Sequence, residues 1–125
     1  MSEKKENTFF PKEIFETKIG LEMNKDILYS LYKSGVTPEA SLPIEFFFMS
    51  DHEEKIKRLY EFLIAEFPDY IDLEIRPKND NYELSGKTSP IKMDLSSINA
   101  WNQQMWDLGY QYDCMVDGMA YNGSD

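Results

Sequence analysis

Residues 44–76 read IEFFFMSDHEEKIKRLYEFLIAEFPDYIDLEIR. The stretch begins with an alternating segment at residues 44–49, in which both alternating sets of side chains are largely apolar, as in a strand at the centre of a sheet. Apolar residues then recur every three or four positions from Ile56 to Phe67, as on one side of a helix. After a proline, strict alternation returns at residues 70–76. The stretch therefore predicts a central strand, an amphipathic helix and a half-buried strand.

Local signals predict where the helices begin and end. Ser50 and Glu53 have the spacing of a capping box, in which the serine oxygen accepts a hydrogen bond from the backbone N–H three residues later. Two more helices follow from the same rules: one over residues 19–34 that ends at Gly35 in a left-handed conformation, and one capped by Asp94 that ends at Gly109.

Two further strands complete the expected order. Residues 82–87 alternate and follow a turn, so they predict a hairpin with the strand at 70–76, and residues 112–117 predict a last strand. After the first helix the order is strand, helix, strand, strand, helix, strand. We therefore expect an α+β fold of the ferredoxin-like βαββαβ type, an antiparallel sheet with helices on one face, preceded by an N-terminal helix. We expect residues 1–17 to form a flexible or loosely docked arm and residues 18–125 to form a single domain.

The composition excludes several classes of protein. The 125-residue chain carries a formal net charge of -10, which opposes direct binding to nucleic acid and favours a basic protein partner. Its longest apolar runs are far shorter than the roughly 20 residues that cross a bilayer. One cysteine cannot form an internal disulfide, which favours a reducing compartment, and we expect the cytoplasm.

The open face of the predicted sheet is the candidate binding surface. If the apolar rows of the strands point at the helices, the other rows bring carboxylates together around apolar side chains, with Arg76 and Lys87 as the opposing charges. Such a surface suits a basic, partly aliphatic segment, although it is also what plain alternation with polar residues outside produces. The expected partner-binding residues are Glu45, Asp72, Glu74, Glu83, Asp113, Asp117, Phe47 and Met115.

Residues 31–63, LYKSGVTPEASLPIEFFFMSDHEEKIKRLYEFL, resemble the RraB family, the type B regulators of ribonuclease E activity. The layout of helix, strand, helix, hairpin, helix and closing strand is also similar over residues 20–121. The family's closing strand begins with a Tyr-Asp-Gly-Trp motif, and Tyr112 and Asp113 of the sequence YDCM match its first half. The alternative register aligns the motif with VDGM at residues 116–119.

The resemblance implies a cytoplasmic, non-catalytic protein that binds an endoribonuclease of the RNase E type and modulates it, most simply by inhibition, without touching RNA. The expected acidic face agrees with this role, because carboxylates can occupy a basic RNA-binding surface in place of phosphate. An immunity protein that neutralises a toxin nuclease would use the same physical chemistry. A third hypothesis is a homo-oligomeric domain that senses a small molecule. Exposed Phe47 or Met115 could equally form the contact of a homodimer.

The chain offers poor material for catalysis, a cofactor or a metal. His52 falls in the first turn of the second helix, where we expect an exposed side chain. Cys114 falls on an inward row and predicts a small core residue. Trp106 lies off the apolar stripe of the last helix, so we expect it to be partly exposed. We therefore expect no enzymatic activity, no cofactor and no metal site.

Overall fold

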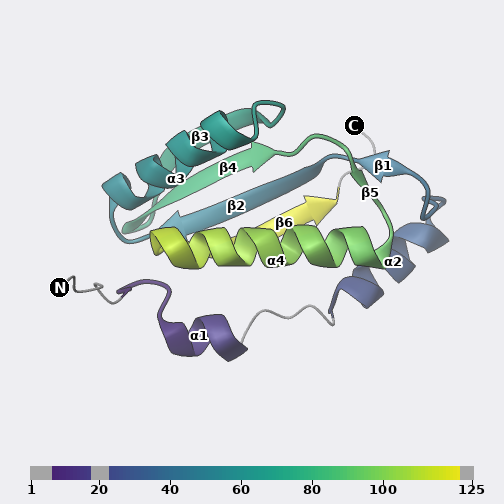
Figure 1. Cartoon of the computed structure of the whole chain (residues 1–125), viewed down its shortest axis with the longest axis horizontal. Coiled ribbons are helices and arrows are strands. Elements are labelled where there is room, and N and C mark those ends of the chain that lie inside the picture. The colour runs from purple at the N-terminus through teal and green to yellow at the C-terminus, as the bar shows by residue number, and fades with distance from the viewer. Residues whose placement is uncertain (1–6, 18–22, 122–125) are drawn as a thin grey trace.

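The computed structural model describes residues 7–17 and 23–121, which form a mixed α+β fold. Figure 1 shows the sheet with the long helix α4 running across it and the short helix α1 below α4. The helices are α1 (Lys12–Thr17), α2 (Met23–Lys33), α3 (Glu53–Glu66) and α4 (Leu95–Tyr112). The strands are β1 (Ser41–Leu42), β2 (Ile44–Ser50), β3 (Ile71–Lys78), β4 (Asn81–Lys87), β5 (Ile91–Lys92) and β6 (Met115–Tyr121).

The strands form two antiparallel sheets. The larger has four strands in the order β3-β4-β2-β6, and the smaller pairs β1 with β5. The predicted central position of β2 is confirmed, because it pairs with β4 on one side and β6 on the other. The α+β class is confirmed as well, with two short strands that the sequence analysis did not anticipate.

One face of the larger sheet carries the core. Ile44, Phe46 and Phe48 of β2 are buried, and they alternate with half-buried residues, as the sequence predicts. Both α3 and α4 pack against this row, since their buried stripes belong to the same core cluster. Burying each of these large side chains contributes on the order of 2 kcal/mol. The stripes are Ile56, Leu59 and Leu63 from α3 and Ile98, Trp101, Met105 and Leu108 from α4.

Two predicted helix ends are confirmed. Gly35 has φ 111, and the N–H of the next residue, Val36, donates to the carbonyl of Leu31 at 3.1 Å, which closes α2 as predicted. Asp94 caps α4, since its Oδ1 atom accepts from the Ser97 N–H at 2.8 Å. Residues 19–22 of the first predicted helix lie outside the described residues.

The predicted capping box at Ser50 is wrong. The structure places His52 at the start of α3, with no hydrogen bond from its side chain to the helix. Ser50 is fully buried, and its hydroxyl donates to the carbonyl oxygen of Asp113 at 2.6 Å. The Ser50 hydroxyl is therefore hydrogen-bonded to Asp113, a residue far away in the sequence, and does not cap α3.

The predicted end of α4 at Gly109 is also wrong, because the helix continues to Tyr112. Asp113 then adopts the left-handed conformation, with φ 57, and the Cys114 N–H donates to the Gly109 carbonyl at 2.7 Å. Gly109 still needs to be a glycine, since a Cβ atom there would lie 2.3 Å from the carbonyl oxygen of Cys114. The last strand consequently begins at Met115.

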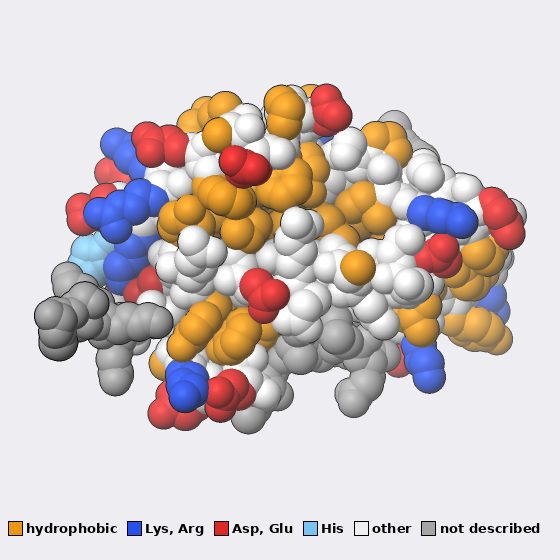
Figure 2. Space-filling view, in the orientation of Figure 1, with side chains coloured by type: hydrophobic (Ala, Val, Ile, Leu, Met, Phe, Trp, Pro, Cys, Tyr) orange, Lys and Arg blue, Asp and Glu red, His pale blue; other side chains and the backbone are white. Residues whose placement is uncertain are grey.

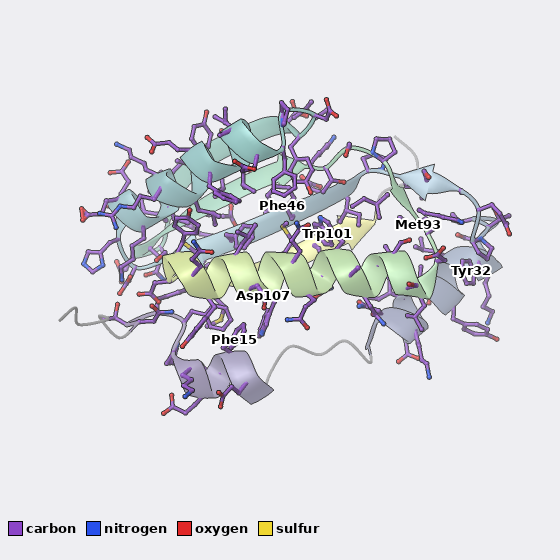
Figure 3. All side chains as sticks on the ribbon, viewed as in Figure 1. Phe15, Tyr32, Phe46, Met93, Trp101 and Asp107 are labelled. Carbon is purple, nitrogen blue, oxygen red and sulfur yellow. The ribbon has the colours of Figure 1, made fainter. Side chains whose placement is uncertain are left out.

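Residues 7–17, part of the segment that we expected to be a flexible or loosely docked arm, lie against α4. Phe10 is fully buried, with its ring 4.9 Å from the Trp106 ring and 5.7 Å from the Tyr110 ring. Figure 3 shows Phe15 of α1 directed toward α4, where it stacks on Tyr110 at 4.2 Å. The expected partial exposure of Trp106 is wrong for this reason, since only 7% of it is exposed. The division of the chain at residue 17 stays a prediction.

Candidate protein-binding face

The second face of the larger sheet points away from α3 and α4. Glu45, Phe47 and Met49 of β2 alternate with the buried core row, so they point to this second face. Each sits opposite a residue of β4, in the pairs Glu45 with Lys87, Phe47 with Ser85 and Met49 with Glu83. We call this surface the open face, and it comprises the outward rows of β2, β3, β4 and β6.

Apolar side chains occupy the middle of the open face. Met49 sits directly opposite Met115 of β6, and Phe47 sits opposite Gly118. All three apolar side chains are half-buried. A Cβ atom on Gly118 would lie 3.9 Å from the Phe47 ring, so the glycine lies beside the ring without placing a side chain against it. The placement of Phe47 and Met115 on one surface agrees with the sequence analysis.

A ladder of opposite charges crosses the open face beside them. The Arg76 guanidinium lies 3.0 Å from the Glu74 carboxylate and 3.9 Å from that of Glu83. The Lys78 ammonium lies 3.1 Å from the Glu83 carboxylate and 3.6 Å from that of Asp117. The hydrogen bond and attraction from Glu83 raise the pKa of Lys78. These ion pairs thus link three strands, β3, β4 and β6, on one side of the sheet.

This ladder makes the open face less acidic than the sequence predicts. Glu83 is only 7% exposed and lies between two cations. The expectation that its carboxylate faces solvent is therefore wrong. The strand predicted over residues 70–76 stops before Pro77, whereas β3 continues to Lys78, so the position of Lys78 on this face was not predicted. Proline is tolerated in β3 because this strand lies at the sheet edge. The exposed acids that remain are Glu74 and Asp117, with Glu45 half-buried.

Asp72 does not continue the outward row of β3. The pairing of β3 with β4 shifts between Ile71 and Glu74, and Asp72 has φ 57, so the strand carries a bulge at this point. Ile71, an apolar residue at the start of the same strand, is 55% exposed. Asp72 is exposed at the corner of the sheet.

Asp113 lies away from the open face, buried at the end of α4. Its carboxylate accepts from the backbone N–H groups of Thr8, Phe9 and Phe10 at 2.8, 2.9 and 2.7 Å. Burial by itself raises the pKa of Asp113, but hydrogen bonds from Lys55 and these backbone groups outweigh it, so the pKa lies below its usual value. The structure therefore gives Asp113 an internal partner in the N-terminal segment.

Tyr112, the other residue of the matched motif, is the last residue of α4. Its ring lies 5.8 Å from that of Phe62 in α3. The two motif residues thus join the end of α4 to α3 and to the N-terminal segment, and neither lies among the open-face residues of β2, β3 and β4.

Metal binding and the single cysteine and histidine were also considered in the sequence, and the structure places each of them. Within residues 7–17 and 23–121 the structure has no cluster of three His, Cys, Asp or Glu side chains that could hold a metal ion. Cys114 is fully buried, as expected, and burial raises the pKa of its thiol to about 12. His52 is exposed, also as expected. No helix in these ranges is long and apolar enough to cross a membrane.

Comparison with known proteins identifies the family. The family described as regulator of ribonuclease activity B (RraB) matches residues 21–120. The chain belongs to the RraB family. No curated protein matches the chain. The RraB match includes everything from α2 to β6 except Tyr121, and leaves out the N-terminal segment at residues 7–17. Membership indicates that this RraB-family chain regulates ribonuclease activity.

Proposed function

We propose that this protein is a non-catalytic, cytoplasmic regulator that binds a ribonuclease of the RNase E type and inhibits it. The family description supports the ribonuclease as the target of regulation. A chain with a net charge of -10 is repelled by RNA, so regulation by contact with the enzyme is more favourable than competition for a site on the substrate.

The observation that carries the proposal is the partly exposed apolar centre of the open face. Phe47, Met49 and Met115 lie together on the side of the sheet opposite α3 and α4. Apolar side chains surrounded by charged ones are the usual composition of a protein–protein contact, with affinity from the centre and orientation from the rim. Glu74 and Asp117 on the rim would pair with basic side chains of the enzyme.

The charge of the whole protein supports a basic partner. The open face itself carries a mixed ladder, so attraction at short range depends on individual pairs. At longer range the net charge of -10 steers a basic surface toward the protein and speeds association. A ribonuclease must present basic residues to RNA, and a bound acidic protein would block RNA from reaching them.

We also infer that the fold is of the ferredoxin-like type. The order β3-β4-β2-β6, with α3 between β2 and β3 and α4 between β4 and β6, supports this assignment. Such a sheet leaves one face free, which the proposed contact requires.

The test is binding of the purified protein to an RNase E-type ribonuclease, measured by calorimetry, together with RNA cleavage by that enzyme. We expect Phe47→Ala combined with Met115→Ala to weaken binding at least about tenfold, because the pair forms the apolar centre. Asp117→Lys should weaken binding about threefold and reduce its dependence on salt.

Matched controls lie on other surfaces. Ile64→Ala removes an apolar side chain that is 47% exposed on α3, and Glu54→Lys reverses an exposed charge there; both should bind as wild type does. If the open-face variants bind normally while remaining folded, the open face is not the contact. Binding to a toxin nuclease alone would support the immunity reading, and a thermal shift with a metabolite in place of either would support a ligand sensor.

A further inference from the structure

A continuous row of aromatic side chains lies between α3 and α4, on the helix side of the molecule. The ring of Tyr112 lies 5.8 Å from that of Phe62, which lies 6.3 Å from that of Phe67. Phe67 stacks on Tyr70 at 4.8 Å, and the Tyr70 hydroxyl accepts from the Trp101 indole N–H at 3.1 Å. We call these five residues the aromatic strip.

The aromatic strip is visible at the surface. Figure 2 shows hydrophobic side chains gathered over the region between α3 and α4. Four of its members are half-buried, and Trp101, labelled in Figure 3 beside Phe46, is 5% exposed. The aromatic strip is therefore anchored in the core by Trp101, and its other four side chains are partly exposed to solvent.

The helix beside the aromatic strip is unusually poor in charge. Asp107 is the one charged residue in the 18-residue sequence of α4, whereas seven of the 14 residues of α3 are charged. The exposed residues of α4 include Ala100, Gln104 and Gln111. In a protein of net charge -10, a surface with aromatic rings and few charges has the composition of a contact rather than of a solvated face.

Charge also limits what can cover the aromatic strip. A second copy would bring another net charge of -10 toward it, including the exposed acids Glu66 and Asp69 beside Phe67. A partner with positive charge is favoured instead. Glu66 and Asp69 flank Phe67, and the Tyr70 N–H donates to the Phe67 carbonyl at 3.0 Å, which brings the acids and the stacked rings into one turn.

We propose that the aromatic strip is a second docking surface, which takes an extended proline-containing segment of a partner protein with an arginine beside Phe67 and Tyr70. Proline rings pack flat against aromatic rings, and an extended polyproline helix loses little entropy on binding. The arginine stacks on the paired rings and meets Glu66 or Asp69.

This surface lies on the opposite side of the sheet from the open face, so the inference does not rest on the proposed function. It predicts that two segments of one partner, or two partners, can bind at once. A regulator with two faces gains affinity by linkage when both are engaged.

The test uses the full-length protein labelled with ¹⁵N and a synthetic peptide in which an arginine follows every three prolines. The indole N–H signal of Trp101 should shift on titration, with a Kd on the order of 100 µM, while that of Trp106, which lies against the N-terminal segment, stays in place. A peptide with glutamate in place of arginine should bind at least about tenfold more weakly.

Variants separate the strip from the rest of the surface. Phe67→Ala should weaken the arginine peptide about fivefold or more, and so should the combination of Glu66→Lys and Asp69→Lys, which changes only exposed side chains and keeps the core intact. Tyr29→Ala, at an aromatic residue 63% exposed on α2, should have no effect. An unmoved Trp101 signal with every peptide would overturn the proposal. So would equal binding of the glutamate peptide, or self-association that shifts the Trp101 signal without peptide.

Discussion

The Oδ2 atom of Asp113 lies 2.6 Å from the Nζ atom of Lys55, and the same carboxylate accepts from three consecutive backbone N–H groups near the N-terminus. Lys55 also contacts Asp51 at 2.9 Å. Asp113 thus joins three parts of the chain: the N-terminal segment, the start of α3 and the end of α4. Removing a partner from such a buried network leaves the others without compensation.

Asp113→Asn should lower the free energy of unfolding by about 2 kcal/mol, since asparagine keeps an acceptor for the backbone groups but loses the charge that faces Lys55. Asp113→Gly removes the side chain while allowing the left-handed conformation, and should cost about 3 kcal/mol. Urea denaturation at neutral pH measures both. Asp107→Asn, at an exposed position of α4, is the matched control and should stay within about 0.5 kcal/mol of wild type.

The same network predicts how stability depends on pH. Burial raises the pKa of Asp51 and Asp113, but hydrogen bonds led by that from Lys55 outweigh it, so both pKa values are lowered in the folded state. A lowered carboxyl pKa stabilises the fold above the unfolded value of about 3.9 and ceases to do so as the pH falls through the folded value. The free energy of unfolding should therefore decrease below about pH 4.

At high pH, deprotonation of Lys55 should lower the free energy of unfolding. Burial lowers its pKa, but hydrogen bonds to Asp113 and Asp51 outweigh this, so the pKa is raised. The contribution of Lys55 to stability is present below the unfolded pKa of about 10.4 and is lost as the pH rises through the folded pKa.

Urea unfolding of Asp113→Asn at a series of pH values checks the role of Asp113 at low pH. The difference between its free energy of unfolding and that of wild type should shrink toward pH 3, and a constant difference would contradict the role given to the Asp113 carboxylate.

Phe10→Ala should cost about 3 kcal/mol, because it removes a fully buried ring from its contacts with Trp106 and Tyr110. Trp106 should then meet solvent, and its fluorescence should move to longer wavelength. Phe9→Ala, at the half-buried neighbouring phenylalanine, should change neither quantity as much. Equal effects at the two positions would show that the segment is not held by Phe10.

Gly109→Ala should destabilise the protein by about 2 kcal/mol even though alanine is the better helix former. The added Cβ atom would lie 2.3 Å from the backbone oxygen of Cys114, which cannot move without opening the turn after α4. Gly118→Ala provides the contrast, since the nearest atom, in Phe47, is 3.9 Å away. Thermal unfolding of both variants should show a clear fall in Tm only for the first.

Cys114 should resist thiol reagents in the folded protein. Burial raises the pKa of its thiol to about 12, so very little thiolate is present near pH 8, and the sulfur is also shielded from solvent. Labelling with a disulfide reagent should become fast only in urea. Rapid labelling without denaturant would mean that the end of α4 opens readily.

Residues were placed correctly where one side of a strand or helix packs against the core and so determines the spacing of the apolar residues. Alternation in β2 correctly identified its buried row, because a strand with one covered side must place every second residue in the core. The stripes of α3 and α4 followed from the same logic with a helical period. The prediction was wrong at Ser50 and Gly109, where residue preferences suggested local caps that tertiary contacts replaced.

The candidate site was predicted only in part. Phe47 and Met115 do lie on the open face, because strand alternation and pairing bring them there. Lys78 was not predicted to lie on this face because the predicted strand stopped before Pro77. At the edge of a sheet a strand can continue through a proline, as β3 does. The bulge at Asp72 could not be predicted, since a shift in register is decided by the pairing with β4.

By itself the sequence determined the α+β class, the buried rows and the resemblance to the RraB family, because these depend on periodicities and motifs that neighbouring residues share. Only the tertiary structure decided that Asp113 is an internal anchor and that Glu83 is masked by two cations. A carboxylate carries no local sign of its partner. Whether it faces solvent or takes up a buried hydrogen bond depends on N–H groups and cations that folding brings from elsewhere in the chain, in the case of Asp113 from more than 100 residues away.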